Sequence, residues 1–310
     1  MSSNKLSIII PIYNESESIE LLYDEIKSQK FPFQYEIIFI DDGSTDKSRS
    51  IIRDLIDKDS AVILIKMKNN YGKSNALSAG FTIASGEIVI TMDGDLQDNP
   101  YEIYDLIDLI KNGYDVVSGW KKNRRDPISK RILSKIFNFF TSIVTGIKIH
   151  DFNCGLKAYR NEVVKSIDVY GGMHRYLPVL AAFNGYRITE KIVKHRERSF
   201  GVSKYGGKRI MKGFFDLLTV IFLGKYLNRP LHFFGKLGIL FLFIGVVINL
   251  YLTYGWFNGV WIGNRPILFL GILFIIIGVQ FFSLGLLGEL IYKINQSNNE
   301  NIDSIIKKEK

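Results

Sequence analysis

The sequence contains a single cysteine, Cys154, among 310 residues, so no disulfide can form within the chain. Chains without disulfides are typical of reducing compartments. Histidine is scarce as well, and the spacing of the four histidines matches no common arrangement of metal ligands. We therefore interpret all of them as structural or surface residues: His150, His174, His195 and His232.

Two nucleotide-binding motifs are missing. No Gly-x-Gly-x-x-Gly follows the first apolar run, and no complete P-loop is present. Gly72-Lys73-Ser74 resembles the end of a P-loop, but Met67 stands where its first glycine is required. These absences argue against a dinucleotide-dependent dehydrogenase and a P-loop NTPase. We expect no cleavable signal peptide, because the chain starts directly with a strand pattern.

Charge is missing from two long stretches, Leu237 to Tyr254 and Ile267 to Gly288. Each is long enough to cross a hydrocarbon core of about 30 Å as a helix. The loop between them contains one charged residue, Arg265, whereas four basic residues flank the pair: Lys225, Arg229, Lys236 and Lys293. The positive-inside rule then predicts that both ends of this hairpin lie in the cytoplasm.

The net charge of +9 comes from 40 basic and 31 acidic residues, and the surplus is concentrated in residues 121–148 and 191–212. Basic clusters beside apolar segments favour an anionic membrane face or a lipid phosphate over a nucleic acid. Pro127 to Ile147 is predicted to be a basic amphipathic helix, for which a membrane-surface role and an ordinary surface role both remain open. Lys208 to Tyr226 is too charged to span a bilayer, and we predict an interfacial helix there.

The chain before about Gly207 alternates apolar runs of strand length with helical patterns. The predicted strands are Leu6 to Ile12, Tyr35 to Ile40, Val62 to Met67, Ile88 to Met92 and Asp115 to Ser118. The predicted helices are Ile19 to Lys27, Ser48 to Lys58, Gly72 to Ala84 and Pro100 to Lys111. This alternation predicts an α/β fold with a mostly parallel sheet and helices on both faces.

Acidic residues follow three of the predicted strands: Glu15, Asp41-Asp42 and Asp93-Asp95. Because parallel strands end at the same edge of a sheet, we expect these acids to converge on one cleft. Asp-x-Asp at a strand end suits a hard divalent ion that carries phosphates. A simpler explanation, a helix cap before Pro100, would account for Asp98 or Asn99 but not for the first two acids.

Two further segments are predicted to be site loops. His150 to Arg160 is dense in polar groups around Asp151, and Glu197 to Tyr205 combines several cations with a glycine. Loops of this kind commonly carry binding and catalytic residues.

Six strings in this order resemble glycosyltransferase family 2: SIIIPIYNE, FIDDGSTD, NYGKSNALSAG, MDGDLQDNP, DFNCGLKAYR and RSFGVSKY. With the two-helix tail they cover residues 6 to about 293. The resemblance is to the polyprenyl-phosphate sugar transferase branch, which includes dolichyl-phosphate mannose synthase and bacterial undecaprenyl-phosphate glucosyltransferase. It implies a GT-A type, Rossmann-like fold with a C-terminal transmembrane hairpin.

The resemblance also implies roles for particular residues. Those expected to bind the nucleotide sugar are Pro11, Tyr13, Glu15, Asp42 and Asp93. Those expected to hold Mg²⁺ or Mn²⁺ are Asp93, Asp95 and Gln97, and the expected catalytic residues are Asp95 and Asp151. Those that we assign to the acceptor phosphate are Lys121, Arg124, Arg131, Ser134, Arg198, Ser203 and Lys204.

The sequence departs from the family pattern at two positions. Lys121 stands where relatives often have arginine, which keeps the charge but loses bidentate phosphate geometry. Cys154 replaces a common Ser or Thr. We interpret Cys154 as a packing residue, not a nucleophile, because no histidine is fixed beside it by the sequence.

The predicted function is an inverting transfer of a hexose from a nucleotide sugar to undecaprenyl or another polyprenyl phosphate, for cell-envelope glycan or protein glycosylation. UDP-glucose is the expected donor, with GDP-mannose and UDP-GlcNAc as alternatives. We expect a homo-oligomer in the bacterial cytoplasmic (inner) membrane, multi-pass, with the catalytic domain on the cytoplasmic face and no nucleic-acid partner. The predicted parts are a catalytic domain (1–207), an interfacial helix (208–230), two transmembrane helices (231–293) and a charged cytoplasmic tail (294–310).

Three other functions remain open. A processive polysaccharide synthase would share Asp-x-Asp, but the Gln-x-x-Arg-Trp string and the further spans expected of it are absent. A nucleotidyltransferase would also use acids at strand ends, yet it has no need of a membrane hairpin. A non-catalytic membrane module would show no metal-dependent nucleotide binding.

Overall fold

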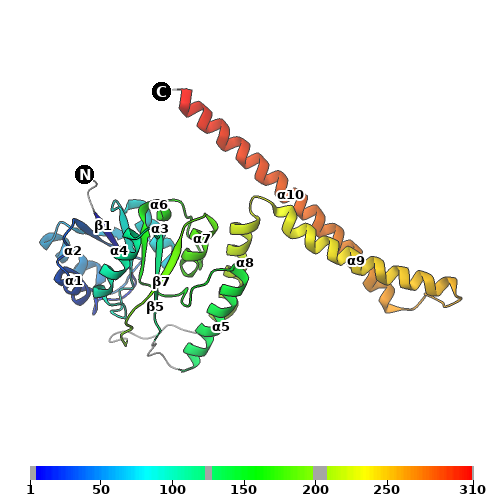
Figure 1. The fold of residues 1–310 in the computed structure, drawn as a ribbon, viewed down its shortest axis with the longest axis horizontal. Helices are drawn as coiled ribbons and strands as arrows, with labels where there is room; N and C mark the ends of the chain where they lie inside the picture. The colour runs from blue at the N-terminus through cyan, green and yellow to red at the C-terminus, as the bar shows by residue number, and fades with distance from the viewer. Residues whose placement is uncertain (1–4, 123–127, 198–207, 309–310) are drawn as a thin grey trace. The chain divides into compact units, whose positions relative to one another are not determined.

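The computed structural model describes residues 5–122, 128–197 and 208–308, and it divides into two units (Figure 1). The first unit runs to Val220 and the second begins at Ile221.

The first unit is organised around a seven-stranded sheet with the order β3-β2-β1-β4-β6-β5-β7. Its strands are β1 (Leu6–Ile12), β2 (Tyr35–Asp41), β3 (Val62–Lys66), β4 (Ile88–Thr91), β5 (Val116–Trp120), β6 (Lys157–Arg160) and β7 (Ile188–Ile192). Only β6 runs antiparallel to its neighbours, β4 and β5. The prediction of a mostly parallel sheet is therefore confirmed, and each of the five predicted strands forms within two residues of its expected bounds.

Helices cover both faces of this sheet, as predicted. The helices from residue 5 to residue 221 are α1 (Ile19–Ser28), α2 (Ser48–Lys58), α3 (Lys73–Ile83), η1 (Pro100–Glu102), α4 (Ile103–Lys111), α5 (Ile128–Thr145), α6 (Asn161–Lys165), η2 (Met173–Arg175), α7 (Leu177–Phe183) and α8 (Lys208–Ile221). The even-numbered side chains of β1 pack with apolar residues of α1, α2 and α4. On the other face, α3 lies so close that a Cβ on Gly80 would meet Ile9 at 2.6 Å. Burial on both faces explains why β1 is a continuous apolar run.

Neither β6 nor the elements between Asn161 and Ile192 were predicted from the sequence. The segment 150–160 was interpreted wholly as a loop, but only its first part is one, and residues 157–160 enter the sheet between β4 and β5. A strand of four residues that contains Lys157 and Arg160 has too weak a periodic signal to detect.

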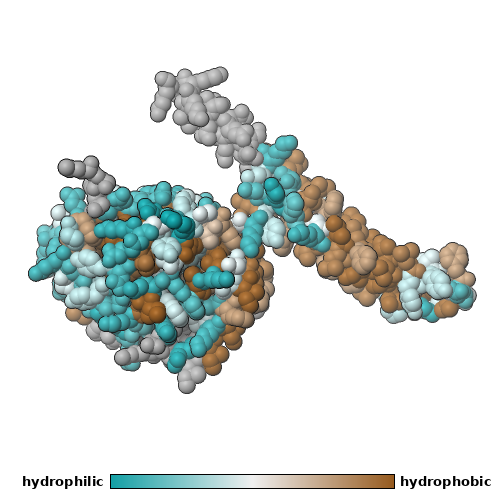
Figure 2. All heavy atoms as spheres, in the orientation of Figure 1, coloured by the Kyte–Doolittle hydropathy of each residue, from teal (hydrophilic) through white to brown (hydrophobic). Residues whose placement is uncertain are grey.

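The second unit is an antiparallel pair of long helices, α9 (Pro230–Phe257) and α10 (Pro266–Lys308), preceded by a π-helical turn, η3 (Phe222–Tyr226). Both helices are long and apolar enough to cross a membrane, over Pro230–Phe257 and Pro266–Ile294. Figure 2 shows apolar residues along their length, with polar residues near the connecting turn. The pair could thus form the predicted transmembrane hairpin.

Glycines allow these two helices to approach each other closely. A Cβ on Gly238 would lie 2.8 Å from the carbonyl oxygen of Gly278, and a Cβ on Gly245 would lie 2.7 Å from that of Gly271. Such small residues allow backbones to approach closely inside a membrane. Gly271 and Gly278 therefore serve the packing of these helices.

Candidate active site

The acidic loop, residues 93–98, follows the end of β4 and is ordered by its own side chains. The Asp98 carboxylate accepts a hydrogen bond from the backbone N–H of Asp93 at 3.0 Å. The Asp95 carboxylate accepts one from the backbone N–H of Gln97 at 3.2 Å. The loop is thereby curled at the carboxyl edge of the sheet, where the sequence predicted an acid cluster.

Arg196 holds the far end of the acidic loop. Its backbone N–H donates to the carbonyl oxygen of Gln97 at 3.2 Å. Its guanidinium donates to both carboxylate oxygens of Glu25 at 2.7 Å and to the side-chain oxygen of Asn99 at 2.8 Å. Asn99 also caps η1, so of the two predicted caps, Asp98 and Asn99, the structure uses Asn99.

Three lysines lie around Asp93. Lys73, the first residue of α3, is ion-paired with Asp93. The ammonium nitrogen of Lys121, at the end of β5, lies 2.7 Å from Asp98 Oδ1. Lys157, on β6, is buried nearby, and its charge acts on Asp93. The sequence analysis assigned only Lys121 to the site; the Gly-Lys-Ser signal at Lys73 was noted only as an incomplete P-loop.

These lysines determine the charge of the acidic loop. Partial burial disfavours the ionised form of Asp93, but the ammonium groups of Lys73 and Lys121 outweigh this effect and hold the pKa of Asp93 below its usual range. Burial likewise disfavours the charged form of Lys121. The negative charge of Asp98 outweighs this effect and raises the pKa of Lys121. Burial lowers the pKa of Lys157. Asp93 is therefore ionised at neutral pH and able to bind a cation.

Asp151 is buried, with 2% of its surface exposed, in the loop before β6. Its carboxylate accepts hydrogen bonds from the backbone N–H of Asn153 at 3.1 Å and of Lys121 at 3.4 Å. The structure thus joins Asp151 to Lys121 through the main chain of Lys121, whose ammonium group contacts Asp98.

The ends of β1 and β2 form another side of the site. Asp42 accepts hydrogen bonds from the backbone N–H groups of Tyr71 and Gly72, at 2.7 and 2.8 Å, and burial raises its pKa. Asp42 thereby fixes the loop that leads into α3. Ser18 donates to the carbonyl oxygen of Gly94 at 2.6 Å, which ties the segment after β1 to the acidic loop. The predicted nucleotide-sugar residues of this segment are half-buried: Pro11, Tyr13 and Glu15.

The structure describes only some of the residues that are predicted to bind the acceptor phosphate. Arg131 is exposed and Ser134 half-buried on α5. Asn138, one turn further along, accepts a hydrogen bond from the backbone N–H of Phe152 at 3.4 Å, so this face of α5 leads toward the Asp151 loop. Four other predicted residues lie outside the described residues: Arg124, Arg198, Ser203 and Lys204.

Cys154 belongs to the hydrophobic core cluster, and burial raises the pKa of its thiol to about 12. A thiol that stays protonated is a poor nucleophile. The interpretation of Cys154 as a packing residue is confirmed.

The chemistry of the acidic loop fits a divalent metal ion, because Asp93 and Asp95 supply the carboxylate oxygens that Mg²⁺ and Mn²⁺ prefer. Within the described ranges, however, no three His, Cys, Asp or Glu side chains come together in a ready-made metal cluster. Asp93 and Asp98 contact lysines. A metal ion would therefore have to share or replace those contacts.

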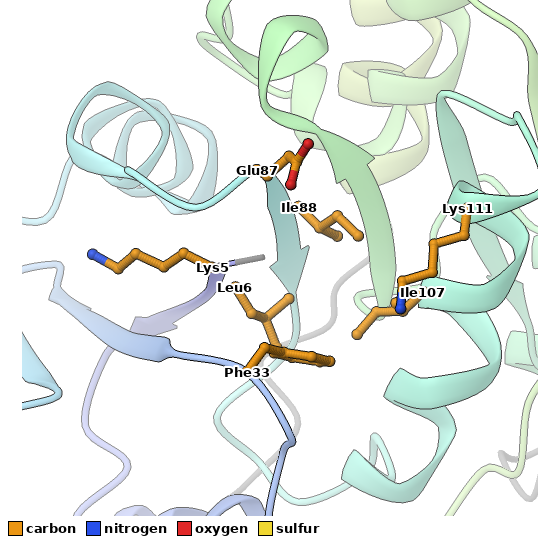
Figure 3. Close-up of a pocket in the computed structure, with 7 residues that line it drawn as sticks. All are labelled: Lys5, Leu6, Phe33, Glu87, Ile88, Ile107 and Lys111. Atoms are coloured by element: carbon orange, nitrogen blue, oxygen red, sulfur yellow. The ribbon is translucent and has the colours of Figure 1, made fainter. Parts of the chain in front are cut away.

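The small hollow in Figure 3 lies at the opposite edge of the sheet. It is lined by the starts of β1 and β4 and by the end of α4, and its volume is about 20 Å³. A hollow of this size holds about one water molecule. The hollow is therefore too small to bind a substrate.

Gly155 packs directly against Asp93 and provides a test of the acidic loop. A Cβ at this position would lie 2.6 Å from the carboxyl carbon of Asp93. We expect Gly155→Ala to displace that carboxylate and to weaken Mn²⁺-dependent nucleotide binding about tenfold, roughly 1.4 kcal/mol, measured by titration calorimetry. Gly213→Ala is the matched control, since its Cβ would meet atoms of Arg175 and Phe137 only at ordinary distances of 3.4 and 3.5 Å. Equal binding by the Gly155 and Gly213 variants would contradict the prediction.

Comparison with known proteins agrees with this geometry. The family model described as Glycosyl transferase family 2 matches residues 7–168. The chain is 35% identical to dodecaprenyl-phosphate galacturonate synthase of Rhizobium johnstonii, over 99% of this chain and 93% of that protein. It is 36% identical to undecaprenyl-phosphate 4-deoxy-4-formamido-L-arabinose transferase of Yersinia pestis, over 94% of this chain and 89% of that protein.

Solved structures share the fold of the first unit. A glucosyl-3-phosphoglycerate synthase from Mycobacterium tuberculosis, solved with Mn²⁺, UDP and glucosyl-3-phosphoglycerate, aligns with a TM-score of 0.56 at 18% identity, over 72% of this chain and 80% of that chain. A mannosyltransferase from Pyrobaculum calidifontis, solved with GDP-Man and Mn²⁺, aligns with a TM-score of 0.52 at 22% identity, over 69% of this chain and 64% of that chain. At these identities the likeness shows a GT-A-like fold.

Proposed function

The chain belongs to glycosyltransferase family 2 and is a glycosyltransferase, and on that premise we propose that it transfers a hexose from a nucleotide sugar to a polyprenyl phosphate. The observation that carries the proposal is that sequence similarity to these relatives extends over almost the whole chain. Two relatives named for polyprenyl-phosphate acceptors match 94% or more of this chain, apolar hairpin included, at 35 and 36% identity. The acid and lysine cluster at the carboxyl edge of the sheet provides the matching chemistry.

The donor's diphosphate would lie at the acidic loop. A divalent ion, when bound there, would offset charge that develops on the departing nucleoside diphosphate. Asp95, Asp93 and Gln97 would hold that ion. Asp42 and the segment after β1 would bind the nucleoside, since both reach the same edge of the sheet.

The acceptor would enter on the side of Asp151 and α5. A phosphate monoester has a second pKa of about 6, so it is largely a dianion at neutral pH and needs no strong general base. The protein has to position this phosphate and neutralise its charge. Arg131 and Ser134 lie on the face of α5 that leads to Asp151, which supports their assignment to the acceptor. A single displacement at the sugar carbon would invert the anomeric configuration.

Apolar surfaces of the first unit support an association with the membrane. Six large apolar side chains of α5 are 42–69% exposed: Ile132, Leu133, Ile136, Phe139, Phe140 and Ile143. On α8, Phe214, Phe215 and Leu218 are also exposed. An amphipathic helix with basic residues beside such a face is typical of the bilayer interface. We propose that α5 and α8 lie on the cytoplasmic face of a bacterial inner membrane and that α9 and α10 span it.

The orientation of the hairpin can be tested with cysteines. Gly259 lies in the connecting turn with φ +80, where a side chain is strained, so we place the probe at the neighbouring Val260, which is 41% exposed. We expect Val260→Cys to react with an impermeant maleimide from outside intact spheroplasts and Lys293→Cys to react only after lysis. The native Cys154 is buried and provides a low background. Labelling of Val260→Cys only after lysis would overturn the proposed topology.

The activity itself is tested with a donor panel. Membranes that contain the enzyme would be incubated with undecaprenyl phosphate and radiolabelled UDP-glucose, GDP-mannose, UDP-GlcNAc, UDP-galacturonate or a UDP-linked 4-deoxy-4-formamido-arabinose. We expect one donor to give a metal-dependent, acid-labile lipid product, and UDP-glucose remains our proposal. Absence of a lipid product with every donor of the panel would contradict the proposal. We also propose a homo-oligomer, which crosslinking in the same membranes would detect.

A further inference from the structure

We propose that Lys73 is an internal counter-ion of the acidic loop: without donor it neutralises Asp93 and opposes binding of a free divalent ion, and with donor it turns to the diphosphate. This inference rests on the proposed function, because it assumes that a metal ion and a nucleotide diphosphate bind at this loop. It predicts that the two bind together and that the metal alone binds weakly.

Lys73 is more exposed than the two other lysines of the site. The Lys121 side chain is only 9% exposed and contacts Asp98, whose side chain is fully buried. Lys157 is 3% exposed and donates to a backbone carbonyl. In contrast, the side chains of Lys73 and Asp93 are 32% and 31% exposed. The pair between Lys73 and Asp93 is thus open to an incoming ligand, while the other two lysines are fixed.

The backbone that carries Lys73 is fixed by hydrogen bonds. Asp42 fixes the N–H groups of the two residues before it, Tyr71 and Gly72. Gly72, with φ 89, then starts α3 at Lys73. The main chain is therefore held, and the long lysine side chain can change partner without moving the helix. The N-terminus of an 11-residue helix lies at the same place, and its positive end favours phosphate.

The formal charges of the site also favour this exchange of partners by Lys73. Among the residues that the structure describes, the acids Asp93, Asp95, Asp98 and Asp151 face the lysines at positions 73, 121 and 157, and these seven groups together carry one formal negative charge. A divalent ion alone would change this net charge from negative to positive, next to the ammonium group of Lys73. A divalent ion that arrives with a nucleotide-sugar diphosphate, one negative charge on each phosphate, restores it. Lys73 therefore opposes binding of the free metal ion, but it does not oppose binding of the metal ion together with its donor.

The test measures Mn²⁺ binding to the full-length protein in detergent, from the electron paramagnetic resonance signal of free Mn²⁺, alone and with UDP or GDP. We expect Lys73→Met and Lys73→Gln to bind Mn²⁺ alone at least about tenfold more tightly than the native protein. The same variants should lose about tenfold or more in UDP or GDP affinity with Mn²⁺ present. Lys73→Arg should keep the weak binding of free Mn²⁺. Lys58→Met, an exposed lysine on α2, is the matched control.

The possible failures are distinguishable. Equal or weaker binding of free Mn²⁺ by both neutral variants, with native-like melting, would overturn the counter-ion role and leave the proposed function intact. If the native protein bound no nucleotide diphosphate, the proposed function would fail, and tighter free Mn²⁺ in Lys73→Met would still support the role of Lys73. Should the neutral variants not fold, tight binding of Mn²⁺ alone by native protein would overturn the inference.

Discussion

Asp95→Asn is expected to lower Mn²⁺-dependent nucleotide affinity about a hundredfold and turnover about a thousandfold, roughly 4 kcal/mol of transition-state stabilisation. In the structure the Asp95 carboxylate accepts the backbone N–H of Gln97 at 3.2 Å. An asparagine side-chain oxygen can accept the same hydrogen bond, so the acidic loop should keep its shape while it loses a charge. The predicted loss therefore reports on the metal ion and not on folding.

The measurement is donor binding by calorimetry and turnover with undecaprenyl phosphate, each with and without Mn²⁺. Asp105→Asn is the matched control, because Asp105 is an exposed acid on α4 that is 2.9 Å from Lys191. Exposed ion pairs contribute about 0–1 kcal/mol, so this variant should behave like the native enzyme. Native turnover by Asp95→Asn at saturating donor would rule out a metal role for Asp95.

Much of the fold was predictable because the sheet of the first unit is buried on both faces. Leu6–Ile12 and Tyr35–Asp41 appear in the sequence as apolar runs of strand length, and the structure has strands there. The acids after them were correctly placed at one edge, since parallel strands end together. The apolar hairpin was equally predictable, because a charge-free run of this length is typical of a transmembrane helix. The strand β6 was missed because it is short and carries charged residues.

The partners of the site residues were much less predictable. The strand-end pattern placed Asp93 at the site and the family resemblance placed Lys121 there. Neither indicated that Lys73 would contact Asp93 or that Lys121 would contact Asp98. Those contacts join residues 20 and 23 positions apart through the topology of the sheet, and a long side chain can reach several acids. Arg196 illustrates the same limit, since it meets Glu25 across 171 positions.

Asp151→Asn is expected to leave nucleotide binding near normal and to reduce turnover about a hundredfold, about 2.7 kcal/mol. The Asp151 carboxylate joins two backbone groups, the N–H of Asn153 at 3.1 Å and the N–H of Lys121 at 3.4 Å. An asparagine can keep the first contact through its oxygen, but its NH₂ group would face the second N–H, donor against donor. The change should therefore shift the end of β5, and with it Lys121, on the acceptor side.

Turnover and donor affinity, measured together, distinguish two roles for Asp151. A carboxylate that only forms a local turn would tolerate asparagine, because the turn survives the substitution. A carboxylate that positions the acceptor side would lose turnover while the donor, bound at the acidic loop, kept its affinity. Asp168→Asn, an exposed acid in the segment before η2, is the matched control and should change neither quantity. If Asp151→Asn retained native turnover and native donor affinity, Asp151 would be a turn-forming residue, and the acceptor phosphate would have to be positioned by the basic residues alone.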